Sequence, residues 1–593
     1  MGVVTSARAV RAEAVVYLPW AAFAAPSGVL VFQMNGVFIG ANWSRDMRNV
    51  MLISFAVFIA ALFAFGQMFG KQGLWAAFHI FLLVRGVSLL SIMGRGVRTA
   101  LRGMIVDWLT LQSGLKGSNC LERVCKAADW LVLHRAVSIL MQLLNSGEME
   151  GSTMQQSAET RLTIDDAVTH EQRVYESSNP TSRQKFEAAK EVLPGGNTRG
   201  SLYFDPFPLF FESARSSKVI DADGHEYSDF GNDLTAAFFG HSNEAIVSAL
   251  KAGLDNGVSY GGTHDHEVAF AREICRRFLS IERVRFLTSG TEANLAAIQL
   301  AKAGTGRRLV LGFFGGYHGN ILNWLEPESE MNVDRADVRL ARFNHIDTVE
   351  QIVRKEGKDI AAILVEPIMG SAGGFMADTA FLSRLRSICD EFGAMLIFDE
   401  VQTARFAVGG YQSVIGVYPD LTTLGKFFGG GLNFGALCGP ARHMDRLGPG
   451  HERTLSYGGT FSNNVLTMIA GHAALKKVFV QENVDRLNAR SNELRFALLR
   501  QANSRGVPLQ LGSFGSLIST HFQADMPRGP EDVKTPPIFR KLLQLFMINN
   551  GIFITRRGQF TVSMANTDDE FSALENAFAI FLDRYGELTD HFD

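Results

Sequence analysis

Two residues in the second half of the chain have side chains suited to covalent and acid–base chemistry. Lys426 lies in the glycine-rich stretch LGKFFGGG at residues 424–431, and Asp399 ends the apolar run at residues 394–398. A lysine amine can form a Schiff base with an aldehyde, and an aspartate at the end of a buried strand can pair with a cationic ring. The two residues therefore predict a site for a cofactor that carries an aldehyde and a ring nitrogen.

Most other parts of such a site lie further toward the amino end. The apolar segment 284–288 runs into Ser289, Gly290 and Thr291, and an alanine- and leucine-rich helical pattern follows. Free N–H groups and hydroxyls at a helix start bind anions such as phosphate. Tyr317 can stack on one face of an aromatic ring, and Val401 can press on the other. An amine, an acid, a phosphate cradle and two ring contacts together predict a pyridoxal phosphate site.

Each of these features taken alone has a simpler interpretation. A Ser-Gly-Thr sequence before a helix is usually only a helix cap. An aspartate after an apolar strand often starts a loop, and a lysine among glycines is mostly a solvated turn. The combination in this order and spacing favours the cofactor site.

The sequence from about residue 165 to the end resembles the class III, or fold-type I, pyridoxal-phosphate aminotransferases. Such a resemblance implies a Schiff-base lysine that also moves the substrate proton, here Lys426, and a pyridinium partner, here Asp399. It implies that Tyr317 stacks on the ring with His318 beside it. It also implies a homodimer, because Thr460 would reach the phosphate of the neighbouring subunit. The motifs that carry the resemblance are SGTEA (289–293), YHG (317–319), DEVQT (399–403), GK (425–426) and GGTFSNN (458–464). The residues expected around the cofactor are Ser289, Gly290, Thr291, Tyr317, His318, Glu366, Asp399, Val401, Gln402, Lys426 and Thr460.

The substrate is predicted from the segment VLPGGNTR at residues 192–199, which resembles both β-amino-acid aminotransferases and glutamate-1-semialdehyde 2,1-aminomutases. The Asn-Thr-Arg continuation and the Gly-Gly-Thr-Phe-Ser-Asn-Asn loop favour an aminotransferase that passes the amino group of a β-amino acid to a 2-oxo acid. The aminomutase is the alternative. Arg199 and either Arg556 or Arg557 are expected to bind substrate carboxylates, because a planar guanidinium suits bidentate pairing. A solvated charge pair is the other interpretation of Arg556 and Arg557.

The 593 residues exceed what one such catalytic unit needs, and the surplus lies at the amino end. Residues 15–44 and 49–70 carry no charge and residues 73–94 only Arg85, so each stretch is long enough to cross a bilayer of about 30 Å as a helix. The segment resembles the last helices of multidrug and toxin extrusion transporters. Because three helices cannot form such a pathway, we expect a membrane anchor or a relic of gene fusion. A third hypothesis is a transport protein whose soluble part is a non-catalytic sensor that retains the cofactor.

Charge and cysteine content limit the other functional classes. Arg45, Arg48, Arg95, Arg98 and Arg102 would lie on one side of the three spans, which predicts a cytoplasmic catalytic domain. The net charge of -3 gives no reason to expect a nucleic acid partner. The five cysteines are scattered, so neither a metal site nor a disulfide framework is expected.

The fold class predicted for the catalytic part is α/β. Apolar segments at about 284–288, 308–313, 360–365 and 394–398 alternate with helical patterns such as 293–303 and 380–392, which indicates a mostly parallel sheet covered on both faces. A smaller α/β domain is expected to follow. The predicted division is a hydrophobic transmembrane segment (1–95), a connector (96–164), an amino-terminal aminotransferase segment (165–240), a large cofactor-binding domain (241–474) and a small domain (475–593).

Overall fold

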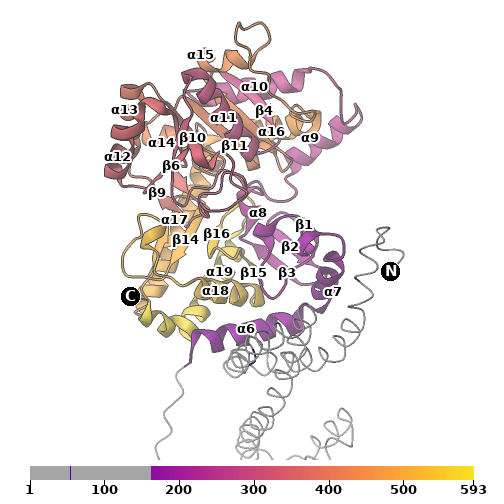
Figure 1. The fold of residues 1–593 in the computed structure, drawn as a ribbon. Helices are drawn as coiled ribbons and strands as arrows, with labels where there is room; N and C mark the ends of the chain where they lie inside the picture. Colours follow the sequence, from indigo (N-terminus) through magenta and orange to yellow (C-terminus); the bar gives the residue numbers. More distant parts are fainter. Residues whose placement is uncertain (1–53, 55–161, 593) are drawn as a thin grey trace, which may run out of the picture. The chain divides into compact units, whose positions relative to one another are not determined.

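The computed structural model describes residue 54 and residues 162–592 (Figure 1). The chain divides into two compact units, residues 1–156 and 157–593, and the fold below is that of the second. Apart from residue 54 and the last three residues of the connector, the predicted transmembrane segment, with its transporter resemblance, and the connector lie outside the described residues, so membrane association and orientation stay predictions. Among the described residues, no helix has the length and apolar character that a membrane crossing requires.

The large domain is built on a seven-stranded sheet with the strand order β4-β12-β11-β10-β7-β5-β6. All its neighbouring strands pair in parallel except β12, which runs antiparallel to both β11 and β4. The four strands predicted from apolar runs are confirmed to within one residue as β4, β5, β7 and β10. The strands are β4 (Arg283–Leu287), β5 (Leu309–Phe313), β6 (Val338–Ala341), β7 (Ile360–Val365), β10 (Met395–Asp399), β11 (Leu421–Gly425) and β12 (Gly435–Gly439).

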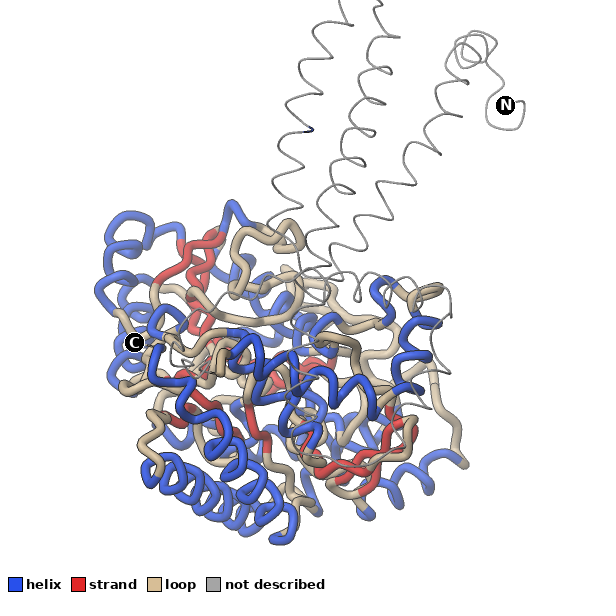
Figure 2. The backbone as a smooth tube through the Cα atoms, turned by 90° about the horizontal axis from the view of Figure 1, so that it is seen from below, coloured by secondary structure: helices blue, strands red, loops and turns tan. Residues whose placement is uncertain are grey.

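The central strands are apolar throughout because helices cover both faces of the sheet. Successive residues of β7 face opposite sides, so Leu364 packs in one core with Ala297, and Val365 in another with Leu385. In Figure 2 the helices (blue) line much of the outer surface and the strands (red) lie among them. The helices of this domain are α9 (Glu244–Leu254), α10 (Asp265–Arg277), α11 (Gly290–Thr305), α12 (Ile346–Glu356), α13 (Thr379–Phe392), α14 (Tyr411–Ile415), α15 (Ala441–Met444) and α16 (Val465–Lys477).

The small domain combines the two ends of the described chain (Figure 1). Strand β3 pairs in parallel with β15, and helix α6 packs against α18. The amino-terminal segment therefore forms one layered unit with the carboxyl-terminal part. Its strands are β1 (Phe211–Arg215), β2 (Lys218–Asp221), β3 (Glu226–Asp229), β13 (Gln510–Gly512), β14 (Leu517–His521), β15 (Ile552–Phe553) and β16 (Gln559–Thr561), and a small hairpin elsewhere is formed by β8 (Ile368–Met369) and β9 (Phe375–Met376). Its helices are α6 (Ile164–Ser178), α7 (Pro180–Ala189), α8 (Asn232–Thr235), α17 (Gln481–Ser504), α18 (Pro537–Asn549) and α19 (Asp568–Tyr585).

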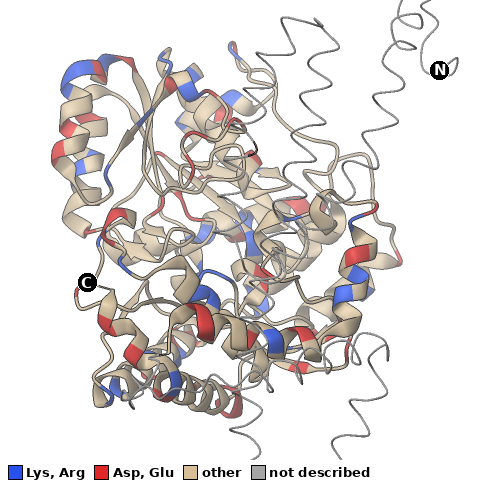
Figure 3. Ribbon diagram, turned by 60° about the horizontal axis from the view of Figure 1, so that its bottom comes forward, with Lys and Arg blue, Asp and Glu red and all other residues tan. Residues whose placement is uncertain are grey.

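Basic and acidic residues are interspersed along the surface helices (Figure 3). Arg384 of α13, for example, pairs with Glu350 of α12 at 3.1 Å and with Glu391 at 2.7 Å. Exposed pairs of this kind contribute roughly 0–1 kcal/mol each to the free energy of unfolding, so they do not determine the fold.

Candidate active site at the carboxyl ends of the strands

Adjacent strands of the large sheet end next to the residues with catalytic side chains. Asp399 is the last residue of β10, Lys426 follows β11, and Glu366 follows β7. Tyr317 and His318 lie in the loop after β5. Because these four strands are parallel, their carboxyl ends meet at one edge, which is where α/β sheets bind ligands. The structure thus brings together the residues that the sequence pattern placed at strand ends.

The carboxylate of Asp399 is buried and accepts three N–H groups. Its Oδ2 accepts from Asn294 Nδ2 and from His318 Nδ1, each at 2.7 Å, and its Oδ1 accepts from the backbone N–H of Val401 at 3.0 Å. A carboxylate has about four acceptor positions, so one remains for a further N–H donor. This orientation suits a partner for a protonated ring nitrogen.

Asn294 is a site residue that the sequence interpretation missed. It lies on α11, buried, where its Nδ2 also donates to the carbonyl of His318 at 3.1 Å and its Oδ1 accepts from Thr423 Oγ1 at 2.7 Å. A single amide therefore ties together β11, the loop after β5 and the Asp399 carboxylate. The available signal was a polar residue within the apolar, alanine-rich part of a helix, which requires partners when it is buried.

The Lys426 side chain is partly buried, and a hydrogen bond fixes the position of its amine. Its φ of 51° is in the left-handed region, and its Nζ donates to the carbonyl of Leu234 at 3.0 Å. Burial lowers the pKa of Lys426 to about 8, helped by the positive charge of Arg557 and opposed by Asp233 and Asp399. The uncharged amine, which a nucleophile or general base requires, is consequently far more populated near neutral pH than for an ordinary lysine.

The carbonyl that holds Lys426 belongs to a strained segment. Asn232, Asp233, Leu234 and Thr235, which form α8, all have positive φ, at 48°, 46°, 51° and 79°. Such conformations cost free energy and persist only where surrounding contacts enforce them.

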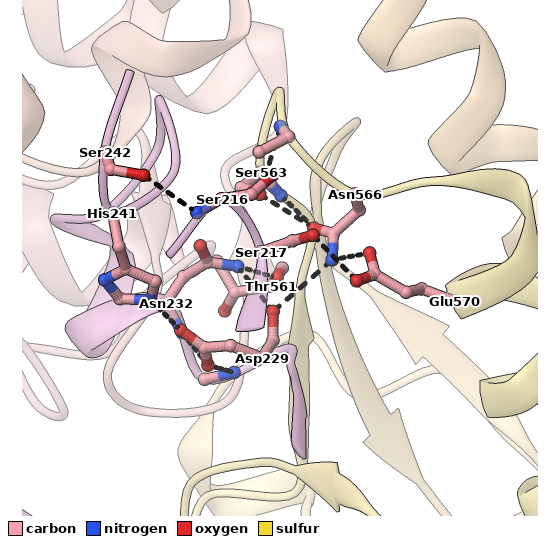
Figure 4. A network of polar contacts seen from close by, with 12 residues as sticks. Ser216, Ser217, Asp229, Asn232, His241, Ser242, Thr561, Ser563, Asn566 and Glu570 are labelled. Atoms are coloured by element: carbon pink, nitrogen blue, oxygen red, sulfur yellow. Dashed lines mark hydrogen bonds and ion pairs between the residues drawn. The ribbon is translucent and has the colours of Figure 1, made fainter. Parts of the chain in front are cut away.

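Figure 4 shows the polar network that enforces this conformation. Asp229 Oδ1 accepts from the backbone N–H of Asn232 at 2.8 Å, and Asp229 Oδ2 contacts His241 Nε2 at 2.7 Å. Asn232 Nδ2 donates to the carbonyl of Thr561. Contacts from β3, the loop after α8 and β16 therefore fix the backbone that orients Lys426.

The expected phosphate cradle is the amino end of α11. Ser289 caps this helix, because its Oγ accepts from the backbone N–H of Glu292 at 3.2 Å, as the simpler interpretation of the motif proposed. Gly290 allows a close approach, since a Cβ there would lie 2.8 Å from Val401 Cγ2. Thr291 lies against Gly319, where a Cβ would come within 2.1 Å of Thr291 Oγ1. The cap does not exclude an anion, because several N–H groups of a first helical turn have no partner within the helix.

Three further predicted residues form the wall of the site. Glu366 is buried, and its Oε2 accepts from the backbone N–H of Tyr317 at 3.0 Å. Burial raises the pKa of Glu366 to about 7, with His318 acting in the opposite direction. Gln402 is also buried, and its Nε2 donates to Ser371 Oγ at 3.2 Å. The Glu366 contact positions the Tyr317 backbone, and the Gln402 contact links the segment after β10 to Ser371.

The predicted carboxylate-binding arginines differ in their surroundings. Arg199 is paired with Asp233, with 2.7 Å between Nη1 and Oδ1. Arg556 is exposed, whereas Arg557 is partly buried near Tyr317 and Glu366, and burial lowers the pKa of Arg557. Thr460 is exposed and lines a separate cavity of about 390 Å³, whose described wall includes none of the other predicted site residues.

Residues 202–567 match the model of the class III aminotransferases, and the chain belongs to this family. The β-phenylalanine transaminase of Variovorax paradoxus is 37% identical over 72% of this chain and 99% of that protein, and a solved structure of the Variovorax enzyme superposes with a TM-score of 0.70. An omega-transaminase structure from Sphaerobacter thermophilus is 34% identical over 69% of this chain and 99% of that chain, with a TM-score of 0.67. The glutamate-1-semialdehyde 2,1-aminomutase of Syntrophomonas wolfei is 36% identical over 58% of this chain and 84% of that protein.

Class III aminotransferases use pyridoxal phosphate, and this chain is a pyridoxal-phosphate-dependent aminotransferase. The residues at the strand ends fit this cofactor. Among the described residues, the partly buried amine of Lys426 has a carbonyl as its one hydrogen-bond partner. Asp399 keeps an acceptor position, and α11 presents its first turn. No group of three or more metal-binding side chains occurs in the part of the chain that the structure describes.

Proposed function

We propose that this aminotransferase moves the amino group of a β-amino acid to a 2-oxo acid, and that Lys426 performs the proton transfer. The observation that carries the proposal is the meeting of Lys426 and Asp399 at the ends of neighbouring strands, with the pKa of Lys426 lowered to about 8. The β-phenylalanine transaminase from Variovorax supports the donor class. Pyridoxal phosphate, when bound, supplies an aldehyde for the amino group and a ring that withdraws electrons.

The other residues then have separate tasks. Asp399, oriented by Asn294 and His318, keeps the ring nitrogen protonated through a charge-assisted hydrogen bond. Ser289, Gly290 and Thr291 hold the phosphate at the start of α11. The side chains assigned to the faces and wall of the ring site are Tyr317, Val401, Glu366 and Gln402.

Substrate assays test the reaction class directly. The purified protein should transfer the amino group of β-phenylalanine to 2-oxoglutarate or pyruvate, and it should give little or no 5-aminolevulinate from glutamate-1-semialdehyde. Rapid conversion of glutamate-1-semialdehyde without an amino acceptor would identify the chain as an aminomutase instead.

Arg557 is the better candidate than Arg556 for a substrate carboxylate. Its guanidinium is partly buried and lies near enough to Tyr317 and Lys426 to influence their pKa values. It forms no hydrogen bond or ion pair with any residue that the structure describes, whereas Arg199 already pairs with Asp233. A partly buried cation without a partner is stabilised when an anion binds.

We expect Arg557→Gln to raise KM for the carboxylate substrate by about 10- to 100-fold, because a charged hydrogen-bond pair contributes roughly 1.5–3 kcal/mol. The same change at the exposed Arg556 should alter KM by less than about threefold. Steady-state kinetics on the two variants measure this difference. Equal losses at both positions would contradict the assignment to Arg557.

Thr460 is proposed to complete the phosphate site of a second copy of the chain. Thr460 is exposed, and the described wall of the cavity that it lines includes neither Lys426 nor the start of α11, which supports a homodimer with shared sites.

Mixed dimers can test this sharing. A dimer of one Lys426→Ala chain and one Thr460→Ala chain should contain one intact site, because the Lys426 of one chain meets the Thr460 of the other. We expect about half of the wild-type kcat per dimer and an unchanged cofactor affinity at the active site. A mixed dimer that binds cofactor as weakly as the Thr460→Ala homodimer would show that Thr460 serves its own subunit.

A further inference from the structure

A cavity of about 420 Å³ beside Arg557 is strongly basic. Arg540, Lys541, Arg556 and Arg557 all line it, and Asp205 is the one acidic side chain among the described residues of its wall. A concave, low-dielectric wall with several like charges concentrates the field that attracts an anion.

Two of the basic side chains belong to one face of helix α18. Pro537, Arg540, Lys541 and Gln544 line the cavity at a spacing of three, four and seven residues, which places them along one side of a helix. The stem of Arg540 also packs close to Gly558, since a Cβ at Gly558 would lie 3.5 Å from Arg540 Cγ. Because Gly558 follows Arg557, the two arginines approach the same cavity from adjoining elements.

The guanidinium of Arg540 has no counterion among the described residues. It forms no hydrogen bond, ion pair or ring contact with any of them, and burial lowers the pKa of Arg540. Lys541, its neighbour on the helix, is paired with Asp205 at 3.7 Å. Removing a guanidinium from water without a partner costs free energy, so a bound anion would offset a cost that the fold now bears.

Two residues that line the cavity also lie next to the cofactor site. Arg557 lines the cavity and influences the pKa of Lys426. Ser371 lines it as well, and its Oγ accepts from Gln402 in the cofactor site. A substrate whose reacting carbon lies at Lys426 can therefore extend past Arg557 into this space.

We propose that Arg540 is a specificity-determining residue that binds a second carboxylate of a dicarboxylic substrate, while Arg557 binds the first. The inference rests on the proposed function and extends it, because it selects a dicarboxylic 2-oxo acid as the amino acceptor. A monocarboxylic acceptor leaves Arg540 without a partner, so the enzyme favours acceptors with two acidic groups. Lys541 adds positive charge at the same wall.

Acceptor kinetics test the assignment with the full-length holoenzyme. Arg540→Gln should lower kcat/KM for 2-oxoglutarate by about 10- to 100-fold, mostly through KM, because one charged contact is lost. Its kcat/KM for pyruvate should stay within about twofold of the wild type. Arg528→Gln, which removes an exposed arginine paired with Asp378, is the matched control and should change neither value.

A binding measurement separates this inference from the reaction itself. Calorimetry should show that Arg540→Gln weakens glutarate binding by about 10- to 100-fold and leaves butyrate binding unchanged. Equal changes for both acids, or no change for either, would overturn the role of Arg540. If the wild type transfers no amino group to either acceptor, the proposed function fails, and the difference between glutarate and butyrate still decides whether Arg540 binds a second carboxylate.

Discussion

Replacing Lys426 with alanine should reduce turnover by at least about 10⁴-fold, because the variant loses both the amine that holds the cofactor and the group that moves the proton. The substitution keeps a Cβ at a position whose φ is 51°, so it adds no backbone freedom of the kind that glycine would bring, and it removes the amine together with its methylene chain. Single-turnover kinetics with a β-amino acid measure the loss. The visible absorption of the bound cofactor should shift as well, because no other residue named at these strand ends supplies an amine.

Two controls distinguish a chemical loss from a damaged fold. Lys185→Ala removes an exposed lysine that pairs with Glu212, and it should retain full activity. Small primary amines in solution should restore part of the activity of Lys426→Ala, since they can take over the proton transfer. Wild-type rates in Lys426→Ala would transfer the role to another lysine.

Much of the site was predictable because its residues end buried strands. A run such as residues 394–398 is apolar on both faces of the sheet, and the polar residue that follows, Asp399, must lie at the strand end. The same reasoning places Glu366 after β7 and Tyr317 after β5, whereas their roles in the site were expected from the family resemblance. Sequence alone was sufficient for these positions because strand and turn are local properties.

The remaining part of the site depends on contacts between distant segments. The strained residues of α8 are held by a hydrogen bond from Asn232 to Thr561 of β16, and no pattern in the local sequence predicts that contact. Asn294 becomes a site residue only because α11 packs against β10 and β11. There its amide donates to Asp399 and accepts from Thr423. Neighbouring Arg556 and Arg557 look equivalent in sequence, and only the fold shows which guanidinium is partly buried near Lys426.

The strained α8 segment contacts both Lys426 and one of the predicted substrate arginines. Leu234 holds the amine of Lys426, and Asp233 pairs with Arg199. A substrate carboxylate that binds Arg199 must therefore compete with Asp233, next to the residue that orients the lysine.

Asp399→Asn should lower kcat by about 10²- to 10⁴-fold while the cofactor stays bound. A neutral amide cannot hold a ring nitrogen in its protonated form, so the ring loses much of its capacity to withdraw electrons. The amide also has one acceptor oxygen where the carboxylate has two. Asn294, His318 and Val401 all donate to this carboxylate, so at least one of their three N–H groups loses its partner.

The conservative change Asn294→Asp tests whether charge or orientation accounts for that loss. It leaves Asp399 ionisable but replaces the Asn294 Nδ2 donor with a second carboxyl group. We therefore expect a smaller fall in kcat than in Asp399→Asn, together with a shifted pH profile of kcat. Rates measured from pH 6 to 9, with cofactor content determined in the same samples, compare the two variants. Near-normal kcat in Asp399→Asn would remove the assigned role, because the other contacts of this carboxylate serve only to orient it.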